Sequence, residues 1–497
     1  SAGKLTLLTM LEELHEWVDS RWGGRLRAAA ARRGGCDAVP EHPMVSIHVP
    51  AHDEPPALLA ATLHALAALD YPCYEVLVVD NNTRDERRWR PVEALCARLG
   101  RRFRFIHVDH LTGYKAGALN LALRHTDPAA RLVAVVDSDY QVRRDWLRAA
   151  VRHFRDPDVA LVQAPQDYRD GQQSLFKAAC VMEYATFFNT GMVTRNERNA
   201  IVQHGTMTIV RGDVLREVQG WAEWCVSEDA ELGLRILASG HKAVYLAESF
   251  GHGVSPDSYA AYKTQRYRWA FGAAQILRAH AGMLLGRRGR RLTPAQRYHF
   301  VAGWLPWLAD GLSLVISVLA ILWTGLMLLW PERLGAPPAA YTLLPLALFA
   351  LRVTKSFDLQ LRCNRVGIGR AIQGTLAGLA LTPTVGWAVL QALARTDTGF
   401  VRTPKLERPH GLPAALRSIR WELFLGGALV ACAVGVGFAG APAGPALDLW
   451  RMLLAAFALP CVAAVALALV GATGRGREHV VQPIGAGSGL IHTAGFD

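Results

Sequence analysis

The sequence V-A-V-V-D-S-D-Y, from Val133 to Tyr140, places two carboxylates, Asp137 and Asp139, at the end of an apolar run. The β-branched residues predict a buried strand, and ligands of open α/β sheets bind at the carboxyl ends of the strands. Two acids around one residue also occur by chance in solvated loops. Behind an apolar strand, however, their oxygen atoms predict a site for Mg²⁺ or Mn²⁺ that would bridge the protein to a diphosphate.

Strands and helices alternate around this segment. We predict strands at 45–49, 75–79 and 103–108, and a helix at 55–69. Such alternation predicts a largely parallel sheet, with the carboxyl ends of its strands at one edge.

Polar residues follow these strands where a ligand would bind. The first strand ends in P-A-H-D-E-P (Pro50 to Pro55) and the second in D-N-N-T (Asp80 to Thr83), while K-A-G-A-L-N (Lys115 to Asn120) opens a helix. Taken singly, Asp80 could cap a helix and Lys115 could be a solvated lysine. A bound nucleotide explains the series together, because carboxylates at strand ends bind base and ribose groups while a lysine beside a helix start meets a diphosphate.

The composition does not suit one soluble domain. The 497 residues are 51% hydrophobic, with a net charge of +12 and a pI near 9.5, and the long apolar stretches begin at Trp304. We assign the basic excess to membrane orientation and phosphate binding and expect no nucleic-acid partner, because no nucleic-acid motif accompanies it. The eight cysteines are scattered without a C-x-x-C pair, which argues against a zinc site or a disulfide framework and favours a reducing compartment.

Several stretches could cross a hydrocarbon core of roughly 30 Å. We predict spans at 304–330, 339–361, 421–440 and 449–471. A further stretch, 371–393, would leave basic segments on opposite faces of the membrane if it crossed, so we predict an interfacial helix kinked near Pro383.

The first 40 residues predict an amphipathic docking helix followed by a basic, glycine-containing loop. The apolar side of the helix would carry Leu7, Leu8, Leu11, Leu14 and Val18. No secretory signal pattern follows Ser1, and membrane segments upstream of it stay an open alternative.

Six motifs in order resemble those of the processive, membrane-embedded family 2 glycosyltransferases, such as cellulose, hyaluronan and β-glucan synthases. They are P-A-H-D-E, V-V-D-N-N, K-A-G-A-L-N, D-S-D, S-E-D (Ser227 to Asp229) and Q-R-Y-R-W (Gln265 to Trp269), and the resemblance runs from about Val45 to Lys405. It implies an α/β cytosolic domain of the GT-A type with a C-terminal α-helical transmembrane bundle and interfacial helices, in the inner membrane of a bacterium.

The resemblance also implies roles for individual residues. The donor nucleotide sugar would be bound by Pro50, Ala51, His52, Glu54, Asp80, Lys115, Asp137, Gln265 and Arg268. Asp139 would be the principal metal ligand, with Asp137 beside it, and Mg²⁺ or Mn²⁺ the cofactor. Asp229 would be the general base with Glu228 next to it, and Ser227 stands where the family more often has threonine, which keeps the hydroxyl.

Two further sites are implied in the same way. The acceptor would meet Trp269, His204, Gly205 and Thr206, and we expect the segment His204 to Thr208 to precede or begin a helix. The segment T-G-F-V-R-T-P-K resembles a gating loop that closes over the donor, with matches at Phe400, Thr403 and Lys405 and with Arg402 where valine is usual.

The chemistry needs a base because an acceptor hydroxyl is a poor nucleophile at neutral pH and must lose its proton as it attacks the anomeric carbon. One displacement inverts the α-linked donor to a β-product, so no glycosidase-type pair of carboxylates is required. Asp310, inside the first predicted span, should face the bundle interior, where a wet sugar channel and a structural hydrogen bond are equal alternatives.

Longer sequence segments indicate which polymer is made. Among them, Q-A-P-Q-D-Y-R-D (163–170) and W-C-V-S-E-D-A-E-L-G-L-R (224–235) resemble β-1,3-glucan synthases, including the NdvB-type cyclic glucan synthases. We therefore expect UDP-glucose as donor, a growing β-1,3-glucan chain as acceptor and product, its export through the protein's own channel, and membrane lipids around the helices. A β-1,4-glucan synthase and a non-processive, lipid-linked sugar transferase are the alternatives, and the oligomeric state is open.

These expectations divide the chain into seven parts. They are an N-terminal helix and basic loop (1–40), a GT-A catalytic domain (41–256), interfacial helices with Q-R-Y-R-W (257–303), two membrane helices and an interfacial helix (304–395), a gating loop (396–420), two membrane helices (421–472) and a cytosolic tail (473–497).

Overall fold

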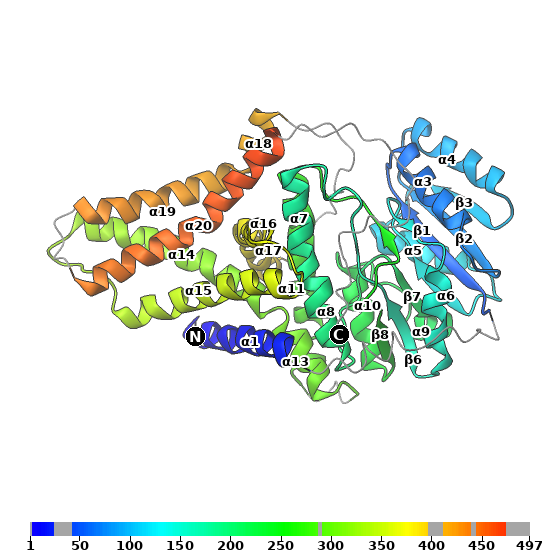
Figure 1. The fold of residues 1–497 in the computed structure, drawn as a ribbon, viewed down its shortest axis with the longest axis horizontal. Coiled ribbons are helices and arrows are strands. Elements are labelled where there is room, and N and C mark those ends of the chain that lie inside the picture. Colours follow the sequence, from blue (N-terminus) through cyan, green and yellow to red (C-terminus); the bar gives the residue numbers. More distant parts are fainter. Residues whose placement is uncertain (1, 24–41, 287–290, 396–410, 439–443, 474–497) are drawn as a thin grey trace.

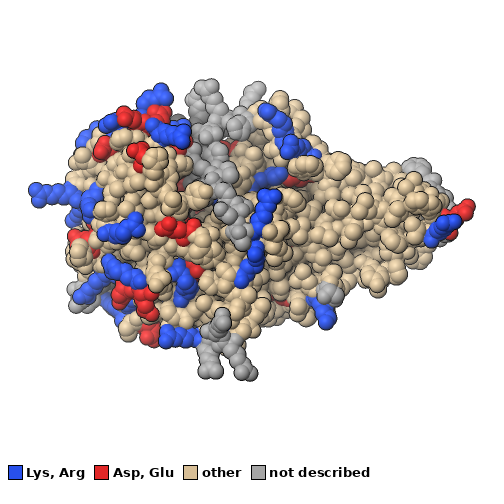
Figure 2. All heavy atoms as spheres, turned by 180° about the vertical axis from the view of Figure 1, so that it is seen from behind, with Lys and Arg blue, Asp and Glu red and all other residues tan. Residues whose placement is uncertain are grey.

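A computed structural model describes residues 2–23, 42–286, 291–395, 411–438 and 444–473. An α/β domain forms one end of the molecule and a bundle of long helices the other (Figure 1). Charged side chains are scattered over the α/β domain and are sparse along most of the tapering bundle (Figure 2). The two parts therefore present surfaces suited to different solvents.

The α/β domain is built on a mixed seven-stranded sheet in the order β3-β2-β1-β4-β7-β6-β8. Its strands are β1 (Val45–Ala51), β2 (Tyr74–Asn81), β3 (Phe103–Val108), β4 (Leu132–Val135), β6 (Val159–Gln163), β7 (Thr208–Arg211) and β8 (Lys242–Tyr245). All neighbours are parallel except those of β7, which runs antiparallel to both β4 and β6. The three strands predicted from sequence are confirmed, and β1, β2 and β4 present their carboxyl ends at one edge.

Strand β4 shows why the run before Asp137 has to be apolar throughout. Leu132 and Ala134 belong to one hydrophobic core, whereas Val133 and Val135 belong to the core on the opposite face. Successive side chains of a strand point to opposite faces, so a central strand covered on both sides is apolar at every position. The second core continues into the helical bundle through residues such as Ala464, which joins the two parts of the molecule.

Helices connect the strands and carry most of the predicted motifs. They are α3 (Pro56–Ala67), α4 (Glu86–Leu99), α5 (Tyr114–His125), α6 (Trp146–Val151), α7 (Leu175–Thr186), α8 (Met192–Asn196), α9 (Gly212–Glu217), α10 (Glu228–Ala238) and α11 (Tyr259–Ala279). A small sheet pairs β5 (Gln141–Val142) with β9 (Gly251–His252). One expectation is wrong: His204 to Met207 lead into strand β7 and not into a helix, because Thr208 starts pairing with Val135 there.

After the short helices α12 (Ala281–Leu284) and α13 (Pro294–Ala302), long helices form the bundle. They are α14 (Leu305–Leu329), α15 (Ala339–Arg362), α16 (Ile368–Ala380), α17 (Thr382–Ala394), α18 (Leu412–Ser418), α19 (Arg420–Phe438) and α20 (Pro445–Thr473). Within the described ranges, four segments are long and apolar enough to cross a membrane: Pro294–Leu329, Ile368–Ala394, Arg420–Gly437 and Pro445–Thr473.

This set differs from the predicted spans at two places. Helix α15 is excluded by composition, because its second half carries Arg352, Lys355, Asp358 and Arg362. The stretch Ile368–Ala394 qualifies by composition, but it is divided at Leu381 into helices of 13 residues each, about 20 Å long and shorter than a hydrocarbon core of roughly 30 Å. Helix α16 packs on α7, and α17 packs on α11. The interfacial placement of this segment stays a prediction.

The N-terminal helix α1 (Ala2–Trp22) is present as predicted, but the side that docks is the opposite one. Thr6, Thr9, Glu12, Glu13 and Ser20 are buried, whereas the predicted apolar face is between 41% and 56% exposed. Helix α1 packs against α14 and α15. The expectation that its leucines form the docking face is therefore wrong.

Candidate active site

A cavity of about 300 Å³ lies at the carboxyl edge of the sheet. Predicted donor, acceptor and catalytic residues gather around it: Pro50, Ala51, His52, Glu54, Lys115, Asp137, Gly205, Glu228, Asp229, Gln265, Arg268 and Trp269. They come from the ends of β1 and β4, the starts of α5 and α10, the loop before β7, and α11. Residues spread over more than 200 positions of sequence thus meet in one site, although their individual roles stay proposals.

Lys115 lies among the carboxylates of this cavity. Its Nζ is 2.6 Å from Oδ1 of Asp137 and 4.0 Å from Oε1 of Glu228, and it donates to the carbonyl of Gly205 at 2.9 Å. The nearby carboxylates raise the pKa of Lys115 against the opposing effect of burial. The lysine is therefore a fixed cation in a site where a diphosphate would add negative charge.

Glu228 and Asp229 occupy the first turn of α10, which begins after Ser227. Burial raises the pKa of Asp229, while the charge of Lys115 acts in the opposite direction. Burial and the neighbouring Asp229 raise the pKa of Glu228 to about 7. A carboxylate with a raised pKa is a stronger base, which suits a group that must accept a proton near neutral pH.

Helix α11 supplies part of the cavity wall. Gln265, Arg268 and Trp269 line the cavity at the predicted offsets. Tyr184 donates to the Gln265 side chain, and the intervening Arg266 pairs with Glu183 while its guanidinium lies 4.9 Å from the centre of the Trp269 ring. These contacts with α7 fix the orientation of the predicted acceptor platform.

Some predicted site residues do not line this cavity. Both oxygens of Asp80 are used inside the domain, where Oδ1 accepts from Thr83 at 2.8 Å and Oδ2 lies 2.8 Å from Nδ1 of His107. Thr206 is buried and bonds through its hydroxyl to the backbone N–H of Asp137. The three gating-loop residues, Phe400, Thr403 and Lys405, lie outside the described residues.

The predicted metal ligands follow β4, but their exposure differs. Asp137 lines the cavity, whereas Asp139 is buried and does not line it, with Oδ2 accepting from the backbone N–H of Val254 at 3.3 Å. No group of three or more His, Cys, Asp or Glu side chains gathers into a metal site within the described ranges. Mg²⁺ is commonly held by one or two carboxylates together with substrate phosphates, so this oxygen pair fits such an ion. Asp137 and Asp139 would hold it, and its charge would stabilise a departing diphosphate.

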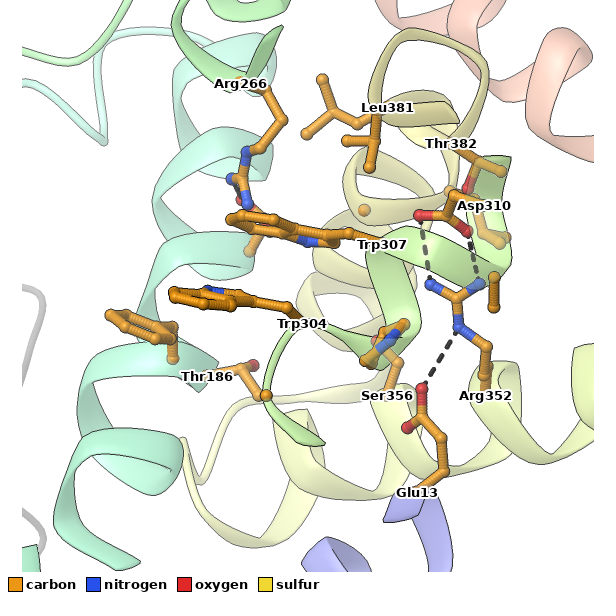
Figure 3. Close-up of a pocket in the computed structure, with 18 of the residues that line it drawn as sticks. Glu13, Thr186, Arg266, Trp304, Trp307, Asp310, Arg352, Ser356, Leu381 and Thr382 are labelled. Atoms are coloured by element: carbon orange, nitrogen blue, oxygen red, sulfur yellow. Dashed lines mark hydrogen bonds and ion pairs between the residues drawn. The ribbon is translucent and has the colours of Figure 1, made fainter. Parts of the chain in front are cut away.

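A second cavity, of about 440 Å³, extends from the site into the helical bundle. It shares Gln166, Ser227, Asp229 and Trp269 with the first cavity and also includes His204. Trp304 and Trp307 lie on one wall of it, and Arg352 reaches from α15 toward both Asp310 and Glu13 (Figure 3). Asp310 therefore faces the interior as predicted, where it both lines the cavity and pairs with Arg352 at 2.5 Å.

The structure adds residues to which sequence reasoning gave no role. Gln166, Tyr114 and Ser138 line the first cavity, and Asn81 and Asn82 do so beside the buried Asp80. Gln166 lies within a string noted for its resemblance, and the asparagines lie within D-N-N-T. The only sequence signal for these residues was that they lie next to a motif. That signal does not show which of the neighbouring side chains face the cavity.

Comparison with known proteins agrees with this geometry. The family described as "Glycosyltransferase like family 2" matches residues 42–272. The cellulose synthase catalytic subunit [UDP-forming] of Pseudomonas fluorescens (strain SBW25) is 30% identical over 275 residues, which are 53% of this chain and 36% of that protein. The probable glucomannan 4-beta-mannosyltransferase 1 of Arabidopsis thaliana is 30% identical over 245 residues, which are 48% of this chain and 44% of that protein.

A solved structure shares the fold. The mannosyltransferase PcManGT from Pyrobaculum calidifontis, in complex with GDP-Man and Mn²⁺, aligns with a TM-score of 0.52 at 20% identity, over 79% of this chain and 99% of that one. The mixed sheet is therefore a GT-A-like α/β domain, followed by long apolar helices. Residues 42–272 thus match the family 2 glycosyltransferase description, and about half of the chain is similar to cellulose synthases and glucomannan mannosyltransferases. The chain spans less than half the length of each of these two curated relatives.

Proposed function

We propose that this protein is an inverting, processive glycosyltransferase that polymerises glucose from UDP-glucose and passes the polymer into its helical bundle. One observation carries the proposal: Asp229 and Trp269 belong to the walls of both cavities. A base and an aromatic ring at that junction would meet a sugar donor on one side and a growing chain on the other.

In the proposed reaction, the acceptor hydroxyl attacks the anomeric carbon of the donor sugar. The new C–O bond forms as the bond to the UDP oxygen breaks, and the hydroxyl proton passes to the carboxylate of Asp229. Lys115 and Arg268 place positive charge at the cavity where the diphosphate leaves. Trp269 would pack its indole face on the apolar face of the acceptor sugar.

The second cavity supports transport of an uncharged polymer. Several of its charged side chains pair with one another, as Arg352 does with Asp310 and Arg266 with Glu183. Trp304 and Trp307 add aromatic surface along the same wall (Figure 3). A neutral glycan could therefore pass with sugar faces on indoles and hydroxyls on fixed polar groups.

For the product we propose a β-1,3-glucan, on the strength of the strings at 163–170 and 224–235. A β-1,4 product is the second candidate, and it is favoured by the cellulose synthase and 4-beta-mannosyltransferase among the relatives. The protein would work in a bacterial inner membrane with its catalytic domain in the cytosol. Mg²⁺ or Mn²⁺ is the proposed cofactor.

The deciding experiment incubates the purified full chain with Mg²⁺ and either UDP-[¹⁴C]glucose or GDP-[¹⁴C]mannose, and then digests the product with linkage-specific glucanases. We expect a high-molecular-weight product from UDP-glucose that β-1,3-glucanase degrades. A product resistant to that enzyme would overturn the linkage, a product from GDP-mannose alone would overturn the donor, and single sugars on lipid would overturn processivity.

A further inference from the structure

Helix α1 is amphipathic with its polar side turned inward. Leu7, Leu11, Leu14 and Val18 recur at spacings of four, three and four residues and form one outward stripe, in which each is at least 41% exposed. Trp22, at the end of the helix, is 72% exposed. A helix at the surface of a soluble protein buries its apolar side against the core. The exposure of the apolar side of α1 therefore indicates that this side does not face water.

Ion pairs fix which side of α1 faces the protein. Rotating the helix about its own axis to bury the apolar stripe would break them. Glu13 reaches Arg352 at 3.3 Å, and Glu16 reaches Lys355 at 2.5 Å. Further along, Asp19 pairs with Arg198 of the catalytic domain at 2.8 Å. These partners come from helix α15 and from the turn after α8, so rotating the helix about its axis would leave several charges unpaired.

The position of α1 connects the stripe to the apolar surface of the bundle. Gly3 lies beside Leu344, while Trp17 donates to Asp358 at 2.8 Å, so α1 runs alongside α15 in the same direction. Next to this contact, Tyr341 and Leu343 of α15 are 74% and 50% exposed. The 21 residues of α1 extend about 31 Å, comparable with the thickness of a hydrocarbon core.

The end of α1 near the catalytic domain has the character of a membrane boundary. The guanidinium of Arg21 lies 5.1 Å from the ring centre of Trp17 and 5.7 Å from that of Trp22. Tryptophan and arginine are the side chains that settle at the level of lipid headgroups. The apolar stripe starts on one side of this cluster, and the catalytic domain lies on the other.

We propose that the outward stripe of α1 lies against lipid acyl chains, so that α1 is a lipid-facing wall of the bundle with its charged side closing the second cavity. Glu12, Glu13 and Glu16 line that cavity from within. The helix would therefore separate lipid from the second cavity. A helix in this position needs apolar side chains on its outer side and polar side chains on its inner side, as α1 has. A second copy of the chain or water on the stripe are the competing possibilities.

The test uses the full chain, purified and reconstituted in phosphatidylcholine–phosphatidylglycerol vesicles, with the photoreactive residue benzoylphenylalanine in place of Leu11 or, separately, Val18. The matched control places the same residue at Arg87, which is exposed on α4 of the catalytic domain. Intact mass after irradiation identifies what each position contacts. We expect lipid adducts at Leu11 and Val18 and none at Arg87.

Adducts to a second copy of the chain at either stripe position would overturn the proposal, and so would the absence of any lipid adduct at both. Two positions keep the test decisive if one variant fails to fold, which binding of UDP or a cooperative thermal transition reports. The readout needs no sugar transfer, so it can succeed or fail independently of the proposed function.

Discussion

The ammonium of Lys115 lies 2.6 Å from Oδ1 of Asp137, inside a cavity that also contains Glu228 and Asp229. One cation thus compensates part of the charge of three carboxylates before any ligand binds. An incoming diphosphate would compete with these acids for the lysine. The position of Lys115 therefore links donor binding to the proton affinity of Asp229.

Lys115→Met should weaken donor binding and shift the pH dependence of transfer. In the proposed mechanism Asp229 must be ionised to act as base, so activity should fall as pH decreases through its raised pKa. Lys115 lowers that pKa, and its removal should move the acidic limb of the rate profile to higher pH. The measurement is the initial rate of transfer against pH. The control is Lys242→Met, because Lys242 lies elsewhere in the domain and pairs with Asp158 at 2.9 Å. If the acidic limb of the Lys115→Met profile stays at the same pH, Lys115 does not control the pKa of Asp229.

Asp229→Asn should abolish transfer while UDP still binds. The amide keeps the shape of the side chain but cannot accept the proton, and loss of a general base costs roughly 10²–10⁴-fold in rate. Radiolabel incorporation measures the rate, and calorimetry with UDP measures binding. Glu93→Gln on the exposed face of α4 is the matched charge control. Retained turnover would remove Asp229 from the role of base.

Gly272→Ala should displace the S-E-D segment. A Cβ at position 272 of α11 would lie 2.2 Å from Oγ and 2.6 Å from Cβ of Ser227, closer than atoms can approach. Overpacking of this kind costs about 1–3 kcal/mol, and a shift of about 1 Å in a catalytic group can cost about 10²-fold in rate. Thermal unfolding and the initial transfer rate check the two effects.

Gly325→Ala is the control for this substitution. Gly325 also lies in a helix, but a Cβ at this position would have no neighbouring atom within 4 Å among the described residues. The control should retain both stability and rate. A Gly272→Ala protein that behaves in the same way would show that Ser227 tolerates displacement without effect on Asp229.

Many residues of the first cavity could be predicted because local patterns determine their positions. Val133 to Val136 predict a buried strand, and a strand that ends at Asp137 delivers that carboxylate to the ligand edge of the sheet. The i, i+3 and i+4 offsets likewise predicted a shared face for Gln265, Arg268 and Trp269, which all line the cavity. The family resemblance then supplied the order of these segments.

Features that depend on distant partners were not predictable. The stripe of leucines in α1 has the pattern of a docking face, and only Arg352 and Lys355, more than 300 positions later, explain why the acidic face docks instead. Asp80 likewise pairs inside the domain with His107, which lies 27 positions later in the sequence. Sequence periodicity assumes water outside and apolar residues inside, and α1 violates that assumption.

Trp307→Ala should shorten the polymer while leaving the first transfer intact. Trp307 lines the second cavity but not the first, so its loss would remove a surface for the proposed growing chain and leave the proposed donor site unchanged. Gel filtration of radiolabelled product measures chain length. Trp387→Ala, on an exposed position of α17, should leave product length unchanged. An equal loss of initial rate in Trp307→Ala would place this tryptophan in catalysis instead.

Asp310→Asn should destabilise the bundle, because it removes the charge of one of the two carboxylates that pair with the buried Arg352. Arg352 keeps Glu13 at 3.3 Å, but it loses the ion pair with Asp310 at 2.5 Å. Breaking one member of a buried ion pair costs roughly 3–5 kcal/mol. Thermal unfolding of the purified protein in detergent measures the loss. The control is Asp448→Asn, because Asp448 is exposed in the first turn of α20. It should lower the free energy of unfolding by only about 0.3–1 kcal/mol, the usual contribution of a charge near the start of a helix. If both variants lose the same small amount of stability, the Asp310–Arg352 pair does not stabilise the packing of α14 on α15. The role of Asp310 would then be its place in the wall of the second cavity.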